Sequence, residues 1–170
     1  MAIDIRTLQH EDAEALLAFE LKNRHWFEQH IDARPAAFYS IDGVRDHIGA
    51  YLDSYARSAW HPCLLLEEGT IIGRANLKDI DTAAGVAEIG YRVAQEATGR
   101  GAASSALQHL VELARSRWRL RQLFAQVIDG NAASARVLVK NGFVPVKREV
   151  ETALVMGERR HLTRYTLKLL

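Results

Sequence analysis

Residues 87–113 read AEIGYRVAQEATGRGAASSALQHLVEL, and this stretch decides the fold. Apolar and polar residues alternate over 87–93, which is the period of a β-strand. Gly99 and Gly101 then break the alternation, and apolar residues return at helical spacing over 103–118. The stretch therefore predicts a strand, a glycine-containing turn and an amphipathic helix in direct succession.

The turn between this strand and helix has the layout of an anion-binding site. The free N–H groups and the positive dipole end of the helix point beyond the strand, and the glycines leave the backbone open to a phosphate. Glycines are also common between strands and helices in any α/β protein, so a purely structural turn is an equal alternative. A dinucleotide loop requires a third glycine where this chain has Ser104, and no Lys-Ser or Lys-Thr pair of a P-loop follows the glycines.

Length and composition limit the protein classes to which the chain can belong. At 170 residues it fits one domain, spanning 1–170. Its 22 basic and 21 acidic residues leave a formal charge of +1, which gives no electrostatic case for binding DNA. The single cysteine, Cys63, has apolar neighbours and suits a core thiol in a reducing compartment. Without a signal-peptide pattern or an apolar run of roughly 18 residues, we expect a cytoplasmic protein with no membrane partner.

The other segments predict a mixed α/β fold with the order β-α-α-β-β-β-α-β-α-β-β. We expect a central mixed sheet of six to seven strands flanked by about four helices. Residues 25–39 lack a clean period, which predicts an irregular segment or a broken helix, and its aromatic residues either line a substrate pocket or cover the core. One strand–helix–strand unit requires a parallel pair, and ligands collect where such strands diverge. Further strands are expected near 3–8, 63–67, 70–78, 122–128, 143–151 and 160–169, and further helices near 11–21, 42–55 and 131–141.

Three motifs follow one another along the chain. AEIGY at 87–91 precedes TGRGAA at 98–103, and the pattern N-x-x-S…K-N-G-F runs from Asn131 to Phe143. In this order and spacing they resemble the GNAT (Gcn5-related) N-acetyltransferases over essentially the whole chain, and the RimJ/RimL type most closely. The second motif stands where that family has Q/R-x-x-G-x-G/A, with Thr98 in place of Gln or Arg. The resemblance implies a GNAT-like fold, acetyl-coenzyme A as cosubstrate and no metal.

The resemblance also implies which residues bind the cosubstrate. Its pyrophosphate is expected on the main-chain amides of the glycine turn, and its pantetheine arm along the strand that ends at Val93. Asn131 either bonds the pantetheine, caps its own helix or does both. A main-chain N–H near Gly90 or Tyr91 is the expected oxyanion donor. The full set of predicted binding residues is Tyr91, Val93, Thr98, Gly99, Arg100, Gly101, Ala102, Ala103, Ser104 and Asn131.

Two residues are the predicted catalytic groups. Glu88 is expected to act as general base, through a water molecule, because many family members carry a glutamate there and it shares a strand face with Gly90. The alternative is an exposed strand residue or an ion-pair partner of an arginine, Arg92 or Arg74. Many GNAT enzymes protonate the leaving thiolate with a tyrosine where this chain has Leu138. That role then passes to Ser134. Alternatively, Ser134 only takes part in capping its own helix.

The predicted function is therefore transfer of an acetyl group from acetyl-coenzyme A to a primary amine, by direct attack in a ternary complex. The acceptor is a protein N-terminal α-amine or a small-molecule amine, and the protein is a monomer or homodimer. A non-catalytic module that binds coenzyme A is the alternative, motivated by Leu138 and Thr98, and a dinucleotide-dependent enzyme is a third. The arginines at 115, 117, 119 and 121 either contact a phosphate of coenzyme A or ribosomal RNA, or form a solvated helix end.

Overall fold

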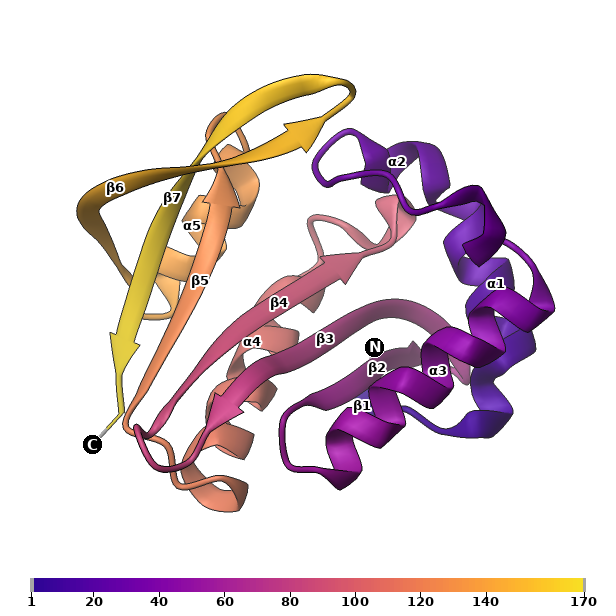
Figure 1. Cartoon of the computed structure of the whole chain (residues 1–170), viewed down its shortest axis with the longest axis horizontal. Helices are drawn as coiled ribbons and strands as arrows, with labels where there is room; N and C mark the ends of the chain where they lie inside the picture. Colours follow the sequence, from indigo (N-terminus) through magenta and orange to yellow (C-terminus); the bar gives the residue numbers. More distant parts are fainter. Residues whose placement is uncertain (1, 170) are drawn as a thin grey trace.

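The structure, a computed structural model, describes residues 2–169, with the side chains of 147–151 outside that description. Seven strands form one sheet in the order β1-β2-β3-β4-β5-β7-β6 (Figure 1). Neighbouring strands are antiparallel except β4 and β5, which are parallel. The predicted mixed sheet is thereby confirmed. The strands are β1 (Asp4–Thr7), β2 (His61–Glu67), β3 (Thr70–Asp81), β4 (Val86–Val93), β5 (Gln122–Ile128), β6 (Val144–Val155) and β7 (Glu158–Lys168).

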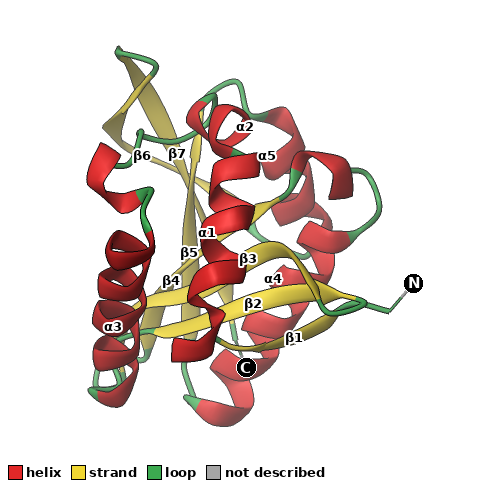
Figure 2. Cartoon of the chain, turned by 90° about the vertical axis from the view of Figure 1, so that its right-hand side faces the viewer, coloured by secondary structure: helices red, strands yellow, loops and turns green. Residues whose placement is uncertain are grey.

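Helices cover both faces of the sheet, with α3 and α4 on opposite sides (Figure 2). Helices α1 and α3 pack on each other and on β3 and β2, while α4 packs on β3 and β4 and contacts α5. None of the helices within residues 2–169 combines the length and apolar character that crossing a lipid bilayer requires. The helices are α1 (Ala13–Lys22), α2 (Arg24–Glu28), α3 (Ile41–Ala56), α4 (Ala102–Glu112) and α5 (Ala132–Lys140).

Helix ends follow from local capping chemistry. The hydroxyl of Ser40 accepts the N–H of Gly43 at 3.0 Å and starts α3. The side-chain oxygen of Asn131 accepts the N–H of Ser134 at 3.3 Å and starts α5, so the predicted capping role is confirmed. Gly142 follows α5 with φ of +91°, a conformation that glycine adopts without strain.

The structure corrects several predicted boundaries. Strand β3 continues to Asp81, because the chain bulges at Asp79 (φ +49°) where the sequence predicted a turn. The last two strands are longer than predicted and meet at the turn formed by Met156 and Gly157. The helix predicted after the glycine turn consists of α4 followed by one π-helical turn, Leu113–Arg117.

The segment 25–39 is a broken helix, as predicted. Five residues form α2, and a 3₁₀ turn follows at Ala36–Phe38. Phe27 and Phe38 are buried in the same core cluster as the sheet, which supports the interpretation that these aromatic residues cover the core. Cys63 lies in this core as well, and burial raises the pKa of its thiol to about 12.

Candidate active site

The parallel strands β4 and β5 pair only at their first residues. Their register begins at Val86 with Gln122 and ends at Glu88 with Phe124. Both strands continue beyond that point, β4 to Val93 and β5 to Ile128, and their carboxyl-terminal halves separate (Figure 1). The sheet is therefore split at the place where α/β proteins bind ligands.

The antiparallel ladder decides which main-chain groups of β4 face this split. The N–H of Ala94 donates to the carbonyl of Ile72 on β3 at 2.8 Å. Since ladder partners alternate along a strand, Gly90 also turns its N–H toward β3, and Tyr91 turns its N–H toward the split. Of the two expected oxyanion donors, Tyr91 has the orientation that the role requires.

Helix α2 is attached to the end of β4. The indole N–H of Trp26 donates to the main-chain carbonyl of Val93 at 3.2 Å. This carbonyl belongs to a residue predicted to bind the cosubstrate, and its second lone pair remains available for another donor. Trp26 thus fixes the position of the strand end where the pantetheine arm was expected.

The glycine turn after β4 has the backbone of an anion cradle. Gly99 and Gly101 have backbone φ angles of +76° and +81°, which residues other than glycine rarely adopt. A Cβ at either position would meet no described heavy atom within 4 Å, so the space in front of both glycines is open. The first helical bond of α4 runs from Ser105 N–H to Gly101 at 2.9 Å, and the N–H groups of 102–104 precede it.

Side chains around the turn are engaged with the protein itself. Arg100 binds both carboxylate oxygens of Glu67 at 3.1 and 3.2 Å, at the end of β2. The hydroxyl of Thr98 donates to the carbonyl of Gln95 at 2.7 Å and closes the preceding 3₁₀ turn, Gln95–Ala97. In this structure the Arg100 charge is therefore paired with Glu67, while the main-chain amides of the turn face open space.

Glu88 forms an ion pair that the sequence did not predict. Its carboxylate lies 2.5 Å from the ammonium of Lys78, the residue directly opposite on β3. Arg92 and Arg74, the partners that were considered, instead approach Glu20. A Cβ on Gly90 would lie 3.3 Å from the Lys78 ammonium nitrogen, so the lysine chain crosses the space that this glycine leaves.

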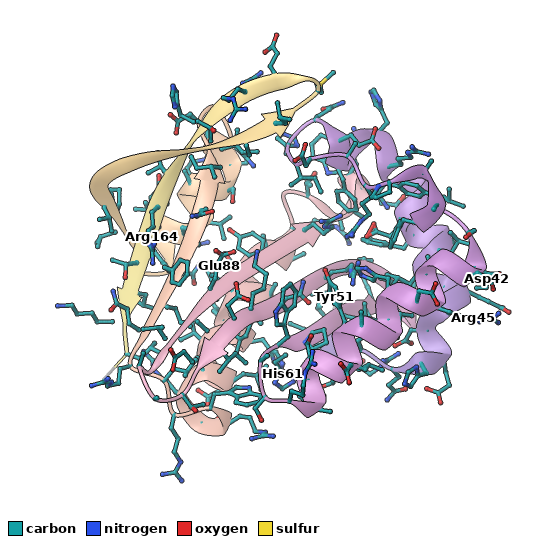
Figure 3. All side chains as sticks on the ribbon, in the orientation of Figure 1. Asp42, Arg45, Tyr51, His61, Glu88 and Arg164 are labelled. Carbon is teal, nitrogen blue, oxygen red and sulfur yellow. The ribbon has the colours of Figure 1, made fainter. Side chains whose placement is uncertain are left out.

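Glu88 lies beside the split on the sheet face opposite to α4 (Figure 3). Its side chain is 18% exposed, so solvent and a ligand can reach it. Phe124, its neighbour on β5, lies under the guanidinium of Arg164 at 3.8 Å. Glu88 and Arg164 therefore border the same face of the opening.

Ser134 approaches the split from the other face. Its hydroxyl is 3.2 Å from the phenol oxygen of Tyr91, whose side chain alternates with that of Glu88 and points toward α4 and α5. Burial raises the pKa of Tyr91, while its hydrogen bond to Ser134 acts in the opposite direction. Leu138, where many GNAT enzymes have a tyrosine, is fully buried. No local pattern in the sequence predicts the Tyr91–Ser134 contact, because it joins residues from β4 and α5.

The remaining predicted polar groups lie elsewhere. The arginines at 115, 117, 119 and 121 are exposed beyond the carboxyl end of α4, whose length of about 16 Å separates them from the glycine turn. This position supports a solvated helix end. Among the described residues, no three His, Cys, Asp or Glu side chains are grouped as a metal site requires.

Comparison with known proteins identifies the family. The model of the acetyltransferase (GNAT) domain matches residues 3–144. The chain belongs to the GNAT acetyltransferase family. This GNAT protein is 30% identical over 144 residues to the probable N-acetyltransferase YjcK of Bacillus subtilis (strain 168), a match that covers 83% of the chain and 80% of YjcK.

Solved structures confirm the GNAT fold. RimL, a ribosomal L7/L12 α-N-protein acetyltransferase in complex with coenzyme A, superposes with a TM-score of 0.91 at 22% identity, covering 99% of this chain and 95% of RimL. The ribosomal-protein-S5-alanine acetyltransferase of Vibrio fischeri gives a TM-score of 0.93 at 19% identity, with coverage of 99% and 93%. The predicted resemblance to the RimJ/RimL type is confirmed. The GNAT protein is an acetyl-coenzyme A-dependent N-acetyltransferase.

Proposed function

We propose that this GNAT enzyme acetylates a primary amine by direct attack in a ternary complex, at the split between β4 and β5. The observation that carries the proposal is the glycine turn with open amides, located immediately beyond a strand that separates from its parallel neighbour. Residues 1–170 act as a single domain in this proposal, and the buried thiol of Cys63 is consistent with a cytoplasmic location.

The cosubstrate would be held by main-chain groups. Acetyl-coenzyme A supplies the acetyl group as a thioester, which requires no covalent enzyme intermediate. The amides from Gly99 to Ser104 fit its diphosphate, because positive φ values and the helix start expose several N–H groups together. The separated edge of β4, from Tyr91 to Val93, fits the amide-containing pantetheine arm, and Asn131, the N-cap of α5, is proposed as a further partner of that arm.

Glu88 is proposed to receive the proton of the attacking amine, through a water molecule. Lys78 holds its carboxylate in place by the ion pair described above. The Tyr91 N–H then stabilises the oxyanion that forms at the acetyl carbon. A protein α-amine, with an ordinary pKa near 7.7–8.0, loses its proton more readily than a lysine side chain near 10.4.

Ser134 is proposed to protonate the leaving sulfur. The N–C bond forms and the C–S bond breaks as the sulfur gains the proton of the Ser134 hydroxyl, while the serine oxygen takes the proton of the Tyr91 phenol and solvent then reprotonates Tyr91. Tyr91 positions that hydroxyl, because its phenol can donate to the serine oxygen and leave the serine proton free. Burial raises the pKa of Tyr91, so the phenol stays protonated as a donor at neutral pH.

The proposed acceptor class is the α-amine at a protein N-terminus. Two of the structural neighbours are named as enzymes that act on ribosomal proteins, one of them explicitly at the α-amine. A carboxylate base is suited to this acceptor, since an α-amine with an ordinary pKa near 7.7–8.0 already has a neutral fraction at neutral pH that is far larger than that of a lysine side chain.

The test is release of free coenzyme A thiol with peptides that have a free or a blocked N-terminus. Glu88→Gln should lower kcat by about 10²- to 10⁴-fold with unchanged affinity for coenzyme A. Glu96→Gln, which removes an exposed ion pair with Lys22, is the matched control. Ser134→Ala and Tyr91→Phe should both lower kcat more than KM. Unchanged turnover of the Glu88→Gln variant across pH would exclude Glu88 as the base. If none of the peptides with a free N-terminus supports thiol release, this acceptor class is excluded.

A further inference from the structure

Three arginines converge on one buried glutamate between the helices and the sheet. The same carboxylate oxygen of Glu20, on α1, lies 3.2 Å from Arg74, 3.4 Å from Arg34 and 3.5 Å from Arg92. The side chains of Glu20 and Arg74 are only 1% and 3% exposed. Arg74 and Arg92 come from β3 and β4, and Arg34 from the segment after α2.

The charges of this cluster do not balance. Three guanidinium groups face one carboxylate, and among the described side chains (2–146 and 152–169) no second carboxylate forms an ion pair with any of the three. His47 does not compensate, because it accepts a hydrogen bond from Arg74 at 2.8 Å as a neutral ring. Its pKa is lowered to about 2 by burial and by the three arginines. Three guanidinium groups share one carboxylate, so a net charge of +2 remains uncompensated in a largely desolvated place.

Strand register brings two of these charges directly together. Arg74 and Arg92 are cross-strand partners in the β3–β4 ladder, where like charges oppose each other. Burial lowers the pKa of Arg92 to about 10, with the Glu20 carboxylate acting in the opposite direction, so the group stays charged at neutral pH. The Nε atoms of Arg34 and Arg74 are buried without a hydrogen-bond partner within the described structure. Like charges side by side and unsatisfied Nε atoms both cost stability, and an anion bound at the arginines would offset this cost.

Two of the arginines are accessible from the proposed acceptor side. The side chains of Arg92 and Arg34 are 24% and 18% exposed. Arg92, Gly90 and Glu88 alternate on one face of β4, with about 6.5 Å between successive members along the strand. The rings of Phe27 and Phe38 lie 5.0 and 4.4 Å from the Arg92 and Arg34 guanidinium carbons and hold them in place.

We propose that the acceptor carries an anionic group, a carboxylate or a phosphate, close to its reactive amine, and that Arg92 and Arg34 bind this group. The inference rests on the proposed function, because it places the amine at Glu88 and the Tyr91 N–H. The planar fork of arginine matches both carboxylate and phosphate, and a bound anion would supply the missing negative charge. An N-terminus with an acidic residue among its first positions is the peptide form of such an acceptor.

The experiment compares matched acceptors that differ only in charge. The pairs are peptides with Ala-Asp or Ala-Asn at the N-terminus, and phosphoethanolamine or ethanolamine. We expect kcat/KM to favour the anionic member by about 10- to 100-fold. Arg92→Gln and Arg34→Gln should remove this preference by raising KM for the anionic member only, and Arg92→Lys should restore part of it. The control Arg57→Gln, which removes an exposed ion pair with Asp53, should leave the preference intact.

Binding measured separately distinguishes this inference from the proposed function. Calorimetry of the same peptides, with saturating coenzyme A to fill the diphosphate site, reports acceptor affinity without turnover. Preferential binding of the acidic peptide that Arg92→Gln abolishes, without thiol release from any acceptor, would support the anion site and refute the proposed catalysis. Equal affinity and equal turnover for the acidic and neutral acceptors would overturn the anion site. Equal losses of affinity for both acceptors in the Arg92→Gln variant would overturn it as well.

Discussion

Replacing the glycines of the turn separates backbone strain from ligand binding. Gly99, Gly101 and Gly157 have φ of +76°, +81° and +78°, and a Cβ at each would meet no described heavy atom within 4 Å. Substitution by alanine therefore costs left-handed backbone strain of about 1–2 kcal/mol at each site, without a steric clash. For a chain of this length, that cost lowers Tm by roughly 2–8 °C.

The three variants should differ in their affinity for coenzyme A. In Gly99→Ala and Gly101→Ala the methyl group enters the open space before the turn and displaces a charge-assisted hydrogen bond worth about 1.5–3 kcal/mol, which raises Kd by about 10- to 100-fold. Gly157→Ala, in the β6–β7 turn, should share the loss of Tm and keep the affinity. Thermal unfolding and calorimetry with coenzyme A measure the two effects. Wild-type affinity in Gly101→Ala would refute the cradle, as would an equal loss of affinity in Gly157→Ala.

Three further predictions concern stability and reactivity. Burial lowers the pKa of His47 to about 2 and that of His61 to about 4. The unfolded chain therefore binds protons before the folded chain does as pH falls below 6.5. The free energy of unfolding, measured with urea, should drop by about 2 kcal/mol per histidine between pH 7 and pH 5, and a pH-independent value would contradict this. Cys63, with its pKa raised to about 12, should react with a thiol reagent at pH 8 only in denaturant, and rapid labelling of the native protein would show that it is accessible. Ser40→Ala removes the cap of α3 and should cost about 1 kcal/mol in the same unfolding assay, whereas Ser116→Ala, at an exposed position late in the chain's π-helical turn, should cost less.

The strand–turn–helix unit could be predicted because its signals are local. Alternation over 87–93, glycines at two positions that require positive φ, and apolar spacing in the following helix all act within one stretch of chain. Helix α2 was less clear, since five residues are too few to show a helical stripe. The end of β3 was misplaced because Asp79 resembles a turn residue but sits in a bulge.

The contacts of the candidate site could not be predicted, because they join distant elements. Lys78 meets Glu88 only through the β3–β4 register, and a bulge beside Lys78 makes that register hard to count from the sequence. Tyr91 reaches Ser134 across the split between strands. The arginine cluster draws on four separate segments, and none of them is unusual by itself.

A crystal structure of this chain with coenzyme A bound would test the central claim most directly. The account predicts the diphosphate oxygens within hydrogen-bond distance of main-chain N–H groups between Gly99 and Ser104, and the thiol in the split between β4 and β5, near Tyr91 and Ser134. A diphosphate bound elsewhere, or a thiol outside that split, would contradict it.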